Sequence, residues 1–182
     1  MAIGAYGIVN RIVFLFIMLI MGFTQGMQPI AGYNYGAKLY PRVKKVLKLT
    51  IICATATTTL AFLVGELIPN AMVSLFTRDA ELKELSSHAL RIIVAIFPIV
   101  GFQIVATSFF QSIGYARKAI FLSLSRQLLF LLPFLIIFPR LWGTDGVWWS
   151  MPASDIVAAL IALLMISRLM KTFGRDEKAI LE

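Results

Sequence analysis

Residues 27–45 read MQPIAGYNYGAKLYPRVKK, a stretch that begins among apolar residues and ends in a cluster of cations. Two tyrosines and an asparagine lie at its centre, between Gly32 and Gly36. Four basic residues follow without an acid: Lys38, Arg42, Lys44 and Lys45. Tyrosine rings settle at membrane–water interfaces, and lysine and arginine keep a loop in the cytoplasm. The stretch therefore predicts that a membrane-spanning helix ends here, with Gly36 as a suitable end residue.

The composition places the whole chain in a lipid environment. Of its 182 residues, 59% are hydrophobic and only 14% are charged, and the mean hydropathy is +0.86. Soluble domains carry about a quarter charged residues. The net charge of +8 does not indicate a nucleic-acid partner, because the basic residues sit between apolar stretches, as juxtamembrane residues do. The single cysteine, Cys53, excludes a disulfide or a cysteine-based zinc site within one chain.

Five segments are long and apolar enough to cross a bilayer, which takes about 20 residues. They are predicted at residues 9–31, 49–69, 91–113, 119–139 and 148–169. The connections are predicted to be interfacial: residues 32–48, 70–90, 114–118 and 140–147. Residues 1–173 are thus expected to form one membrane-embedded unit, and residues 174–182 a short charged tail. The predicted fold class is an all-α membrane protein with five transmembrane helices.

The distribution of lysine and arginine predicts the orientation, since these residues accumulate on the cytoplasmic side. One face collects eleven of them: Lys38, Arg42, Lys44, Lys45, Lys48, Arg117, Lys118, Arg168, Lys171, Arg175 and Lys178. The other face has four: Arg78, Lys83, Arg91 and Arg140. We expect a multi-pass protein of the bacterial plasma membrane with its N-terminus outside and its C-terminus in the cytoplasm. An outside N-terminus without a signal peptide leads us to expect a partial chain.

Three charged residues lie within or near the predicted spans. Asp155 is a candidate protonatable or cation-pairing carboxylate, or one half of a structural ion pair. Arg126 is interpreted as pairing with a carboxylate or reaching the cytoplasmic interface. Glu66 stands at the outer end of its span, where interfacial placement competes with a role in coupling.

Uncharged polar and aromatic residues supply the candidate lining of a substrate cavity. The candidates are Gln25, Gln28, Phe97, Gln103 and Gln111, with hydrogen bonding between helices or lipid contact as the alternative. The first span contains two pairs of glycines four residues apart, with a proline between the pairs. Such glycine pairs permit close helix packing, and the proline softens the backbone, so the span is predicted to pack closely and to bend. The residues are Gly22, Gly26, Pro29, Gly32 and Gly36.

Several chemical signatures are missing from the sequence. It contains no Walker A motif, no HExxH motif and no histidine–cysteine cluster with metal-ligand spacing. We therefore predict neither an enzyme nor a cofactor or metal site. A transporter built on this chain would draw its energy from an ion gradient.

An ordered set of motifs resembles the multidrug and toxic-compound extrusion (MATE) family. The matching motifs are residues 22–30 (GFTQGMQPI), 32–38 (GYNYGAK), 42–45 (RVKK), 75–79 (LFTRD), 109–118 (FFQSIGYARK), 125–127 (SRQ), 143–148 (GTDGVW) and 152–155 (PASD). The resemblance implies twelve helices in two six-helix bundles, of which this chain matches helices eight to twelve. It thus implies most of the C-terminal lobe, with the N-terminal lobe as its partner.

The resemblance also implies a function, cation-coupled export of drugs or other amphiphilic organic compounds, driven by protons or sodium. Some members place a coupling carboxylate on the third helix of this lobe, but residues 91–113 contain neither Asp nor Glu. The coupling site of a full-length relative is therefore expected in the first bundle, and Asp155 and Glu66 are not assigned to it. Two alternatives stay open: a flippase for lipid-linked saccharides or peptidoglycan precursors, and a non-transporting membrane fragment.

Overall fold

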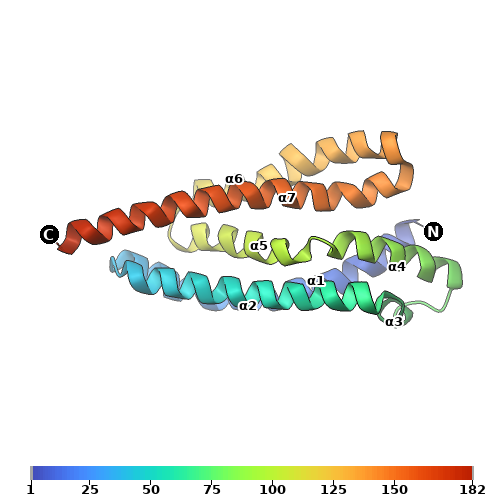
Figure 1. The fold of residues 1–182 in the computed structure, drawn as a ribbon, viewed down its shortest axis with the longest axis horizontal. Coiled ribbons are helices and arrows are strands. Elements are labelled where there is room, and N and C mark those ends of the chain that lie inside the picture. Colours follow the sequence, from blue (N-terminus) through green and yellow to red (C-terminus); the bar gives the residue numbers. More distant parts are fainter. Residues whose placement is uncertain (1, 182) are drawn as a thin grey trace.

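The computed structural model describes the backbone of residues 2–181 and the side chains of residues 2–175. The described chain is a bundle of helices arranged along one axis (Figure 1). The helices are α1 (Ala2–Gly36), α2 (Tyr40–Leu67), α3 (Pro69–Ser74), α4 (Ala80–Val94), α5 (Phe97–Ser112), α6 (Ala116–Leu124), the π-helix η1 (Ser125–Leu131) and α7 (Leu132–Leu181).

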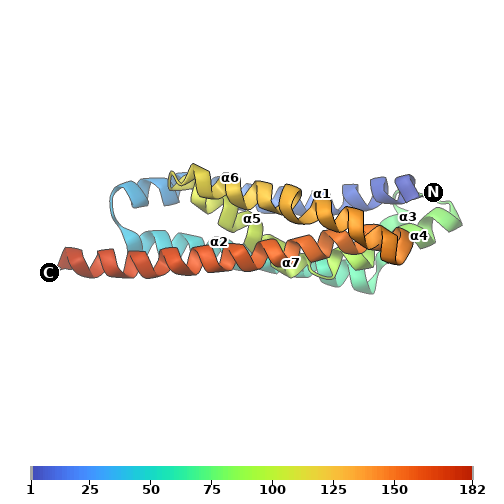
Figure 2. The same cartoon turned by 90° about the horizontal axis from the view of Figure 1, so that it is seen from above.

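The chain crosses the long dimension of the bundle five times. α1 and α2 are each long and apolar enough to span a membrane, and α4 and α5 pass the same test together with a bend of 56° between them. The apolar stretch from residue 116 to 175 turns back on itself within α7, where Trp142 and Gly143 leave helical geometry. Figures 1 and 2 show this reversal at the end of the bundle where the N-terminus lies.

The connections between the long helices are shorter than the sequence predicted. Of residues 32–48, only residues 37–39 lie outside a helix, because α1 continues to Gly36 and α2 begins at Tyr40. A prediction from hydropathy ends each helix where the apolar residues stop. The helices continue further, because tyrosine and lysine at the interface can still adopt helical geometry. In the turn between α1 and α2, Lys38 adopts the left-handed backbone conformation, with a φ of 57°. The backbone of residues 174–181 likewise continues α7 as a helix.

Residues 70–90, predicted as a connection, fold into α3 and most of α4. Asp79 begins α4: its carboxylate accepts a hydrogen bond of 2.9 Å from the amide of Leu82, which satisfies one of the free donors of the first turn. The bend that follows falls at Ala95 and Ile96, and Pro98 then occupies the first turn of α5. Proline is tolerated there because the first amides of a helix have no intrahelical acceptor.

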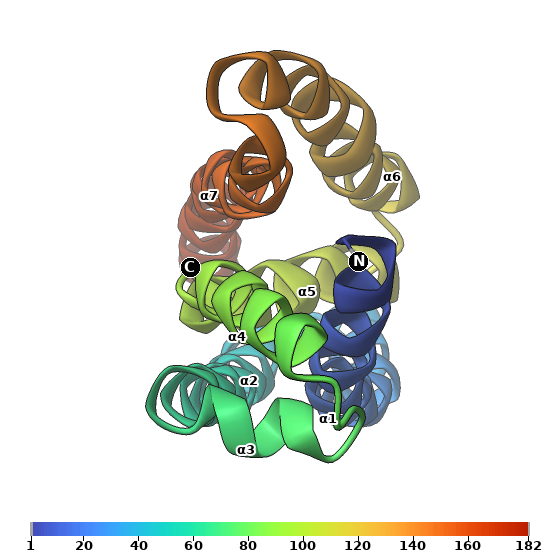
Figure 3. The same cartoon turned by 90° about the vertical axis from the view of Figure 1, so that its right-hand side faces the viewer.

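Close helix contacts hold the bundle together, and the end-on view shows α1, α2, α4 and α5 packed beside the hairpin of α6 and α7 (Figure 3). A Cβ at Gly32 would lie 2.9 Å from the carbonyl oxygen of Ser112, so α1 and α5 nearly touch. A Cβ at Gly101 would lie 2.9 Å from the carbonyl oxygen of Ala54, so the backbones of α5 and α2 also nearly touch. Small residues let membrane helices approach in this way.

The outward surface of the bundle is apolar, as lipid contact requires. Large aliphatic and aromatic side chains are exposed along all five passes, including Phe14, Leu15, Leu19, Leu60, Leu63, Ile99, Leu128, Leu129, Leu160, Leu163 and Leu164. Each square ångström of such surface costs about 25 cal/mol in water. The bundle therefore has the surface of a protein embedded in a bilayer.

Candidate functional site

A buried ion pair joins the two arms of the α6–α7 hairpin. Arg126, in η1, donates from Nε to Oδ1 of Asp155, in α7, at 2.5 Å. The Asp155 side chain is 10% exposed and that of Arg126 is 37% exposed, so the carboxylate is the buried partner. A carboxylate removed from water is stable as an ion only when a cation and hydrogen bonds compensate it. Arg126 supplies both, so the pair is a polar link between these arms.

The guanidinium of Arg126 projects from a segment with unusual helical geometry. Residues Ser125–Leu131 form a π-helix, and the amide of Leu132 donates to the carbonyl of Gln127, five residues earlier. Pro133 follows directly and has no amide hydrogen, so the regular α pattern cannot run unbroken through this position. Single π-turns inside longer helices are frequent at functional sites. Arg126 and Gln127 of this segment line a pocket together with residues of α5.

A polar pocket of about 160 Å³ opens where α5 faces this segment. It is lined by Gln103, Ile104, Thr107, Ser108, Leu122, Ser123, Arg126 and Gln127. Gln103 is 5% exposed, and its Oε1 accepts no hydrogen bond from any described side chain or backbone group. A buried acceptor without a donor is costly. The Gln103 oxygen is enclosed, whereas the partly exposed guanidinium of Arg126 can offer hydrogen bonds to an acceptor in the pocket.

The other predicted cavity residues do not join this pocket. Gln25 and Gln111 are exposed and Gln28 is half-buried. Phe97 is buried in an apolar cluster with Ile12, Val100 and Trp148. Glu66 is half-buried near the end of α2. Of the five predicted cavity residues, the structure thus places only Gln103 beside Arg126.

The glycines predicted to promote packing lie in different surroundings. Gly32 meets the backbone of α5, as described above. A Cβ at Gly22, Gly26 or Gly36 would meet no atom of the described residues within 4 Å. Pro29 lies inside α1, which continues through it to Gly36. A role for Gly22, Gly26 and Pro29 in bending or packing stays a prediction.

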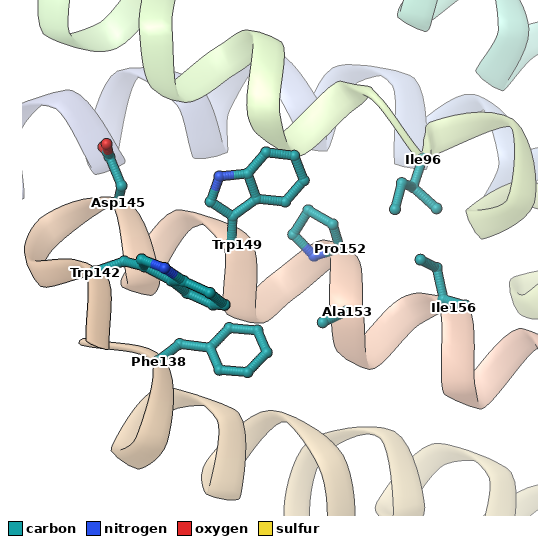
Figure 4. A pocket seen from close by; sticks show the side chains of 8 residues that line it. All are labelled: Ile96, Phe138, Trp142, Asp145, Trp149, Pro152, Ala153 and Ile156. Atoms are coloured by element: carbon teal, nitrogen blue, oxygen red, sulfur yellow. The ribbon is translucent and has the colours of Figure 1, made fainter. Parts of the chain in front are cut away.

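A second pocket, of about 450 Å³, was not predicted from the sequence. We call it the aromatic pocket; it is lined by Ile96, Phe138, Trp142, Asp145, Trp149, Pro152, Ala153 and Ile156 (Figure 4). Two of its lining residues, Trp142 and Trp149, are of the type that is enriched at membrane–water interfaces. The sequence does carry one indication of this pocket: Trp142 and Trp149 lie on opposite sides of the turn at residues 143–146. This turn brings Phe138 and Trp142 close to Trp149 and Pro152.

Among the residues whose side chains the structure describes, no group of three or more His, Cys, Asp or Glu could hold a metal ion. The polar pocket offers hydrogen-bonding groups and one ion pair, and the aromatic pocket offers aromatic faces and one carboxylate.

Replacing Gln103 with leucine is expected to raise the free energy of unfolding by about 1 kcal/mol, because it removes a buried acceptor that has no donor. Chemical unfolding in micelles measures this effect. Gln111→Leu, at an exposed position of the same helix, is the matched control and should leave the free energy of unfolding unchanged. A destabilised Gln103→Leu protein would contradict the assignment.

Comparison with known proteins agrees with this architecture. The sequence model of the MatE family matches residues 1–137. Multidrug export protein MepA of Staphylococcus aureus (strain N315) is 29% identical over 181 residues, and that of Staphylococcus haemolyticus (strain JCSC1435) is 25% identical. Both alignments cover 100% of this chain and 40% of the relative. The chain thus spans about 40% of the length of the curated relatives it matches.

Solved structures contain the same arrangement of helices. The MATE multidrug transporter DinF-BH has a TM-score of 0.82 and 38% identity, covering 90% of this chain and 36% of that one. An outward-facing MATE transporter of the MOP superfamily has a TM-score of 0.87 at 23% identity, covering 94% of this chain and 39% of that one. At this lower identity, the second likeness shows the fold alone.

Proposed function

Since the chain belongs to the MatE family of membrane multidrug transporters, we propose that it forms most of the C-terminal lobe of a cation-coupled antiporter. The antiporter exports drugs or other amphiphilic organic compounds in exchange for protons or sodium. An N-terminal lobe completes the cavity. The N-terminus of this chain lies outside and its C-terminus in the cytoplasm of a bacterial plasma membrane.

The observation that carries the proposal is the polar cluster inside an otherwise apolar bundle. Ionisable residues are rare within membrane spans and mark substrate or ion pathways by default. Here Arg126 and Asp155 pair across the hairpin, and Gln103 adds a buried acceptor beside them. In this proposal Arg126 presents hydrogen-bond donors to a substrate, Gln103 lies buried beside it, and Asp155 holds Arg126 in place rather than binding the coupling cation.

The same pair argues against a flippase for lipid-linked pyrophosphate. Such a cavity needs several cations that are free to meet phosphate. Among the described lining residues of the polar pocket, Arg126 is the one cation, and Asp155 already neutralises it. An amphiphilic substrate with few charges fits this lining better.

The test is gradient-dependent efflux of ethidium from cells that express the chain together with the first seven helices of a MepA relative, that is, its N-terminal bundle and the helix that the resemblance places before this chain. We expect efflux from the assembled pair, its loss when the proton and sodium gradients are dissipated, and none from either part alone. Co-purification of the two parts verifies assembly. An assembled, folded pair without gradient-dependent efflux would contradict the export function.

A further inference from the structure

The aromatic pocket differs from the polar pocket in position and chemistry. Three segments build most of it: the bend between α4 and α5, one arm of α7 and the other arm of α7. They contribute Ile96, then Phe138 and Trp142, and then Trp149, Pro152, Ala153 and Ile156. Figure 4 shows the two indoles and the phenyl ring gathered around one space, with Pro152 and Ile96 on its far side. None of these residues contributes to the Arg126–Asp155 pair.

The rings of this pocket leave aromatic faces uncovered. Phe138 and Trp142 meet edge to face, with ring centroids 5.0 Å apart, so they fix one another's orientation. Trp142 is 58% exposed and Trp149 is 46% exposed. The neighbouring Trp148 is different: it is 3% exposed and stacks on Tyr6. The chain thus packs one of its tryptophans in the core and leaves the other two facing the pocket.

One carboxylate lies at the rim. Asp145 is the single charged residue among the eight described lining residues. It shares a hydrogen bond of 3.3 Å with Nε2 of His88, in α4, and both side chains are about half exposed. The imidazole of His88 orients the Asp145 carboxylate at the rim of the pocket.

The turn keeps the rings and the carboxylate together. Gly143 adopts a φ of 58°, a left-handed conformation that disfavours other residues. Gly146 lies so close to the carbonyl of Phe138 that a side chain there would overlap it. These two glycines bring the arms of α7 into contact, so the pocket is set by the backbone and not by flexible side chains.

We propose that the aromatic pocket binds an aromatic organic cation of single positive charge. A volume of about 450 Å³ falls within the range of small-molecule sites, roughly 300–1,000 Å³. Aromatic faces attract cations through the ring quadrupole, and Asp145 supplies the compensating charge. An interfacial belt would spread its rings around the bundle, whereas here three rings converge on one space. The ligand class rests on the proposed export function; the position of the site does not.

The experiment measures ethidium binding to the purified chain in lipid nanodiscs by fluorescence anisotropy. We expect Asp145→Asn and Trp142→Leu each to raise the Kd about fivefold, the size of effect that loss of one partly exposed charge or cation–π contact produces. Trp142→Phe keeps an aromatic face and should stay within about twofold of the unchanged chain. Glu81→Gln, an exposed acid of α4, and Phe14→Leu, an exposed aromatic residue of α1, are the matched controls and should leave the Kd unchanged.

A second measurement does not depend on any variant folding. Ethidium monoazide, irradiated with the unchanged chain, should label peptides that contain residues 138–156, and excess ethidium should suppress this labelling. Labelling elsewhere, or a Kd unaffected by both Asp145→Asn and Trp142→Leu, would overturn the inference. Absence of ethidium binding to the unchanged chain would overturn it too. Efflux by the assembled transporter is measured separately, so the export function can hold even when this site fails.

Discussion

Arg126→Leu is expected to lower the free energy of unfolding by about 3 kcal/mol, because removal of one partner of a buried ion pair leaves an uncompensated charge. The effect falls on Asp155, whose side chain is 10% exposed and whose ionic partner, in the described structure, is Arg126. Unfolding of the purified chain from mixed micelles by SDS, followed by circular dichroism, measures the change. Efflux by the assembled transporter should fall in parallel.

The double variant Arg126→Leu/Asp155→Leu separates pairing from general damage. It removes both charges, so it should regain most of the lost stability, since apolar residues often replace a buried pair without cost. Transport should not recover, because the guanidinium is gone. Arg140→Leu, an exposed arginine of α7 without an ion pair to any described side chain, should behave like the unchanged chain. Equal losses in the single and double variants would show that the pairing does not stabilise the hairpin.

Gly146→Ala is expected to disrupt the hairpin of α7 and to cost about 3 kcal/mol or more, at the upper end of overpacking effects. A Cβ at this position would overlap the carbonyl of Phe138 and lie 2.6 Å from the nitrogen of Pro139. These are backbone atoms, so no side-chain rotation relieves the clash. The arms of α7 would have to separate, which opens the aromatic pocket. SDS unfolding and labelling by ethidium monoazide report the two consequences.

Two other glycines provide the comparison for Gly146. Gly143→Ala meets no described atom within 4 Å but places alanine at φ 58° and ψ −136°, a region that glycine alone adopts readily, so its cost should be about 2 kcal/mol, smaller than that of Gly146→Ala. Gly22→Ala, in the middle of α1 with equally open surroundings, should be neutral or slightly stabilising, as alanine favours helices. A Gly146→Ala protein as stable as Gly22→Ala would mean that the two arms are not in contact.

The helical class and the course of the chain were predictable because both follow from local composition. A bilayer demands long apolar helices, and hydropathy finds them directly. The reversal inside α7 was indicated by the glycines at 143 and 146. The extent of the helices was less predictable: α4 is amphipathic and half polar, so a search for apolar runs assigns residues 80–90 to a connection.

The types of residue in the site could be predicted from the sequence, but which of these residues meet in space could be predicted only in part. Arg126 and Asp155 were each expected to seek a partner, but they are 29 residues apart, and their encounter depends on how the hairpin turns. Gln103 and Gln111 look equivalent in sequence. They are separated by eight residues, roughly 80° of rotation around the helix, and only Gln103 is buried against the hairpin. The π-turn at residues 125–131 has no comparable sequence signal apart from Pro133.

The length of α1 has a mechanical consequence. α1 has 35 residues, which correspond to about 52 Å of helix. The hydrocarbon layer is about 30 Å thick, and α1 is fixed to α5 where Gly32 meets Ser112. α1 must therefore tilt or extend into the headgroup region on at least one side. Hydrophobic mismatch is thus built into this bundle, and membrane thickness acts on it as a force.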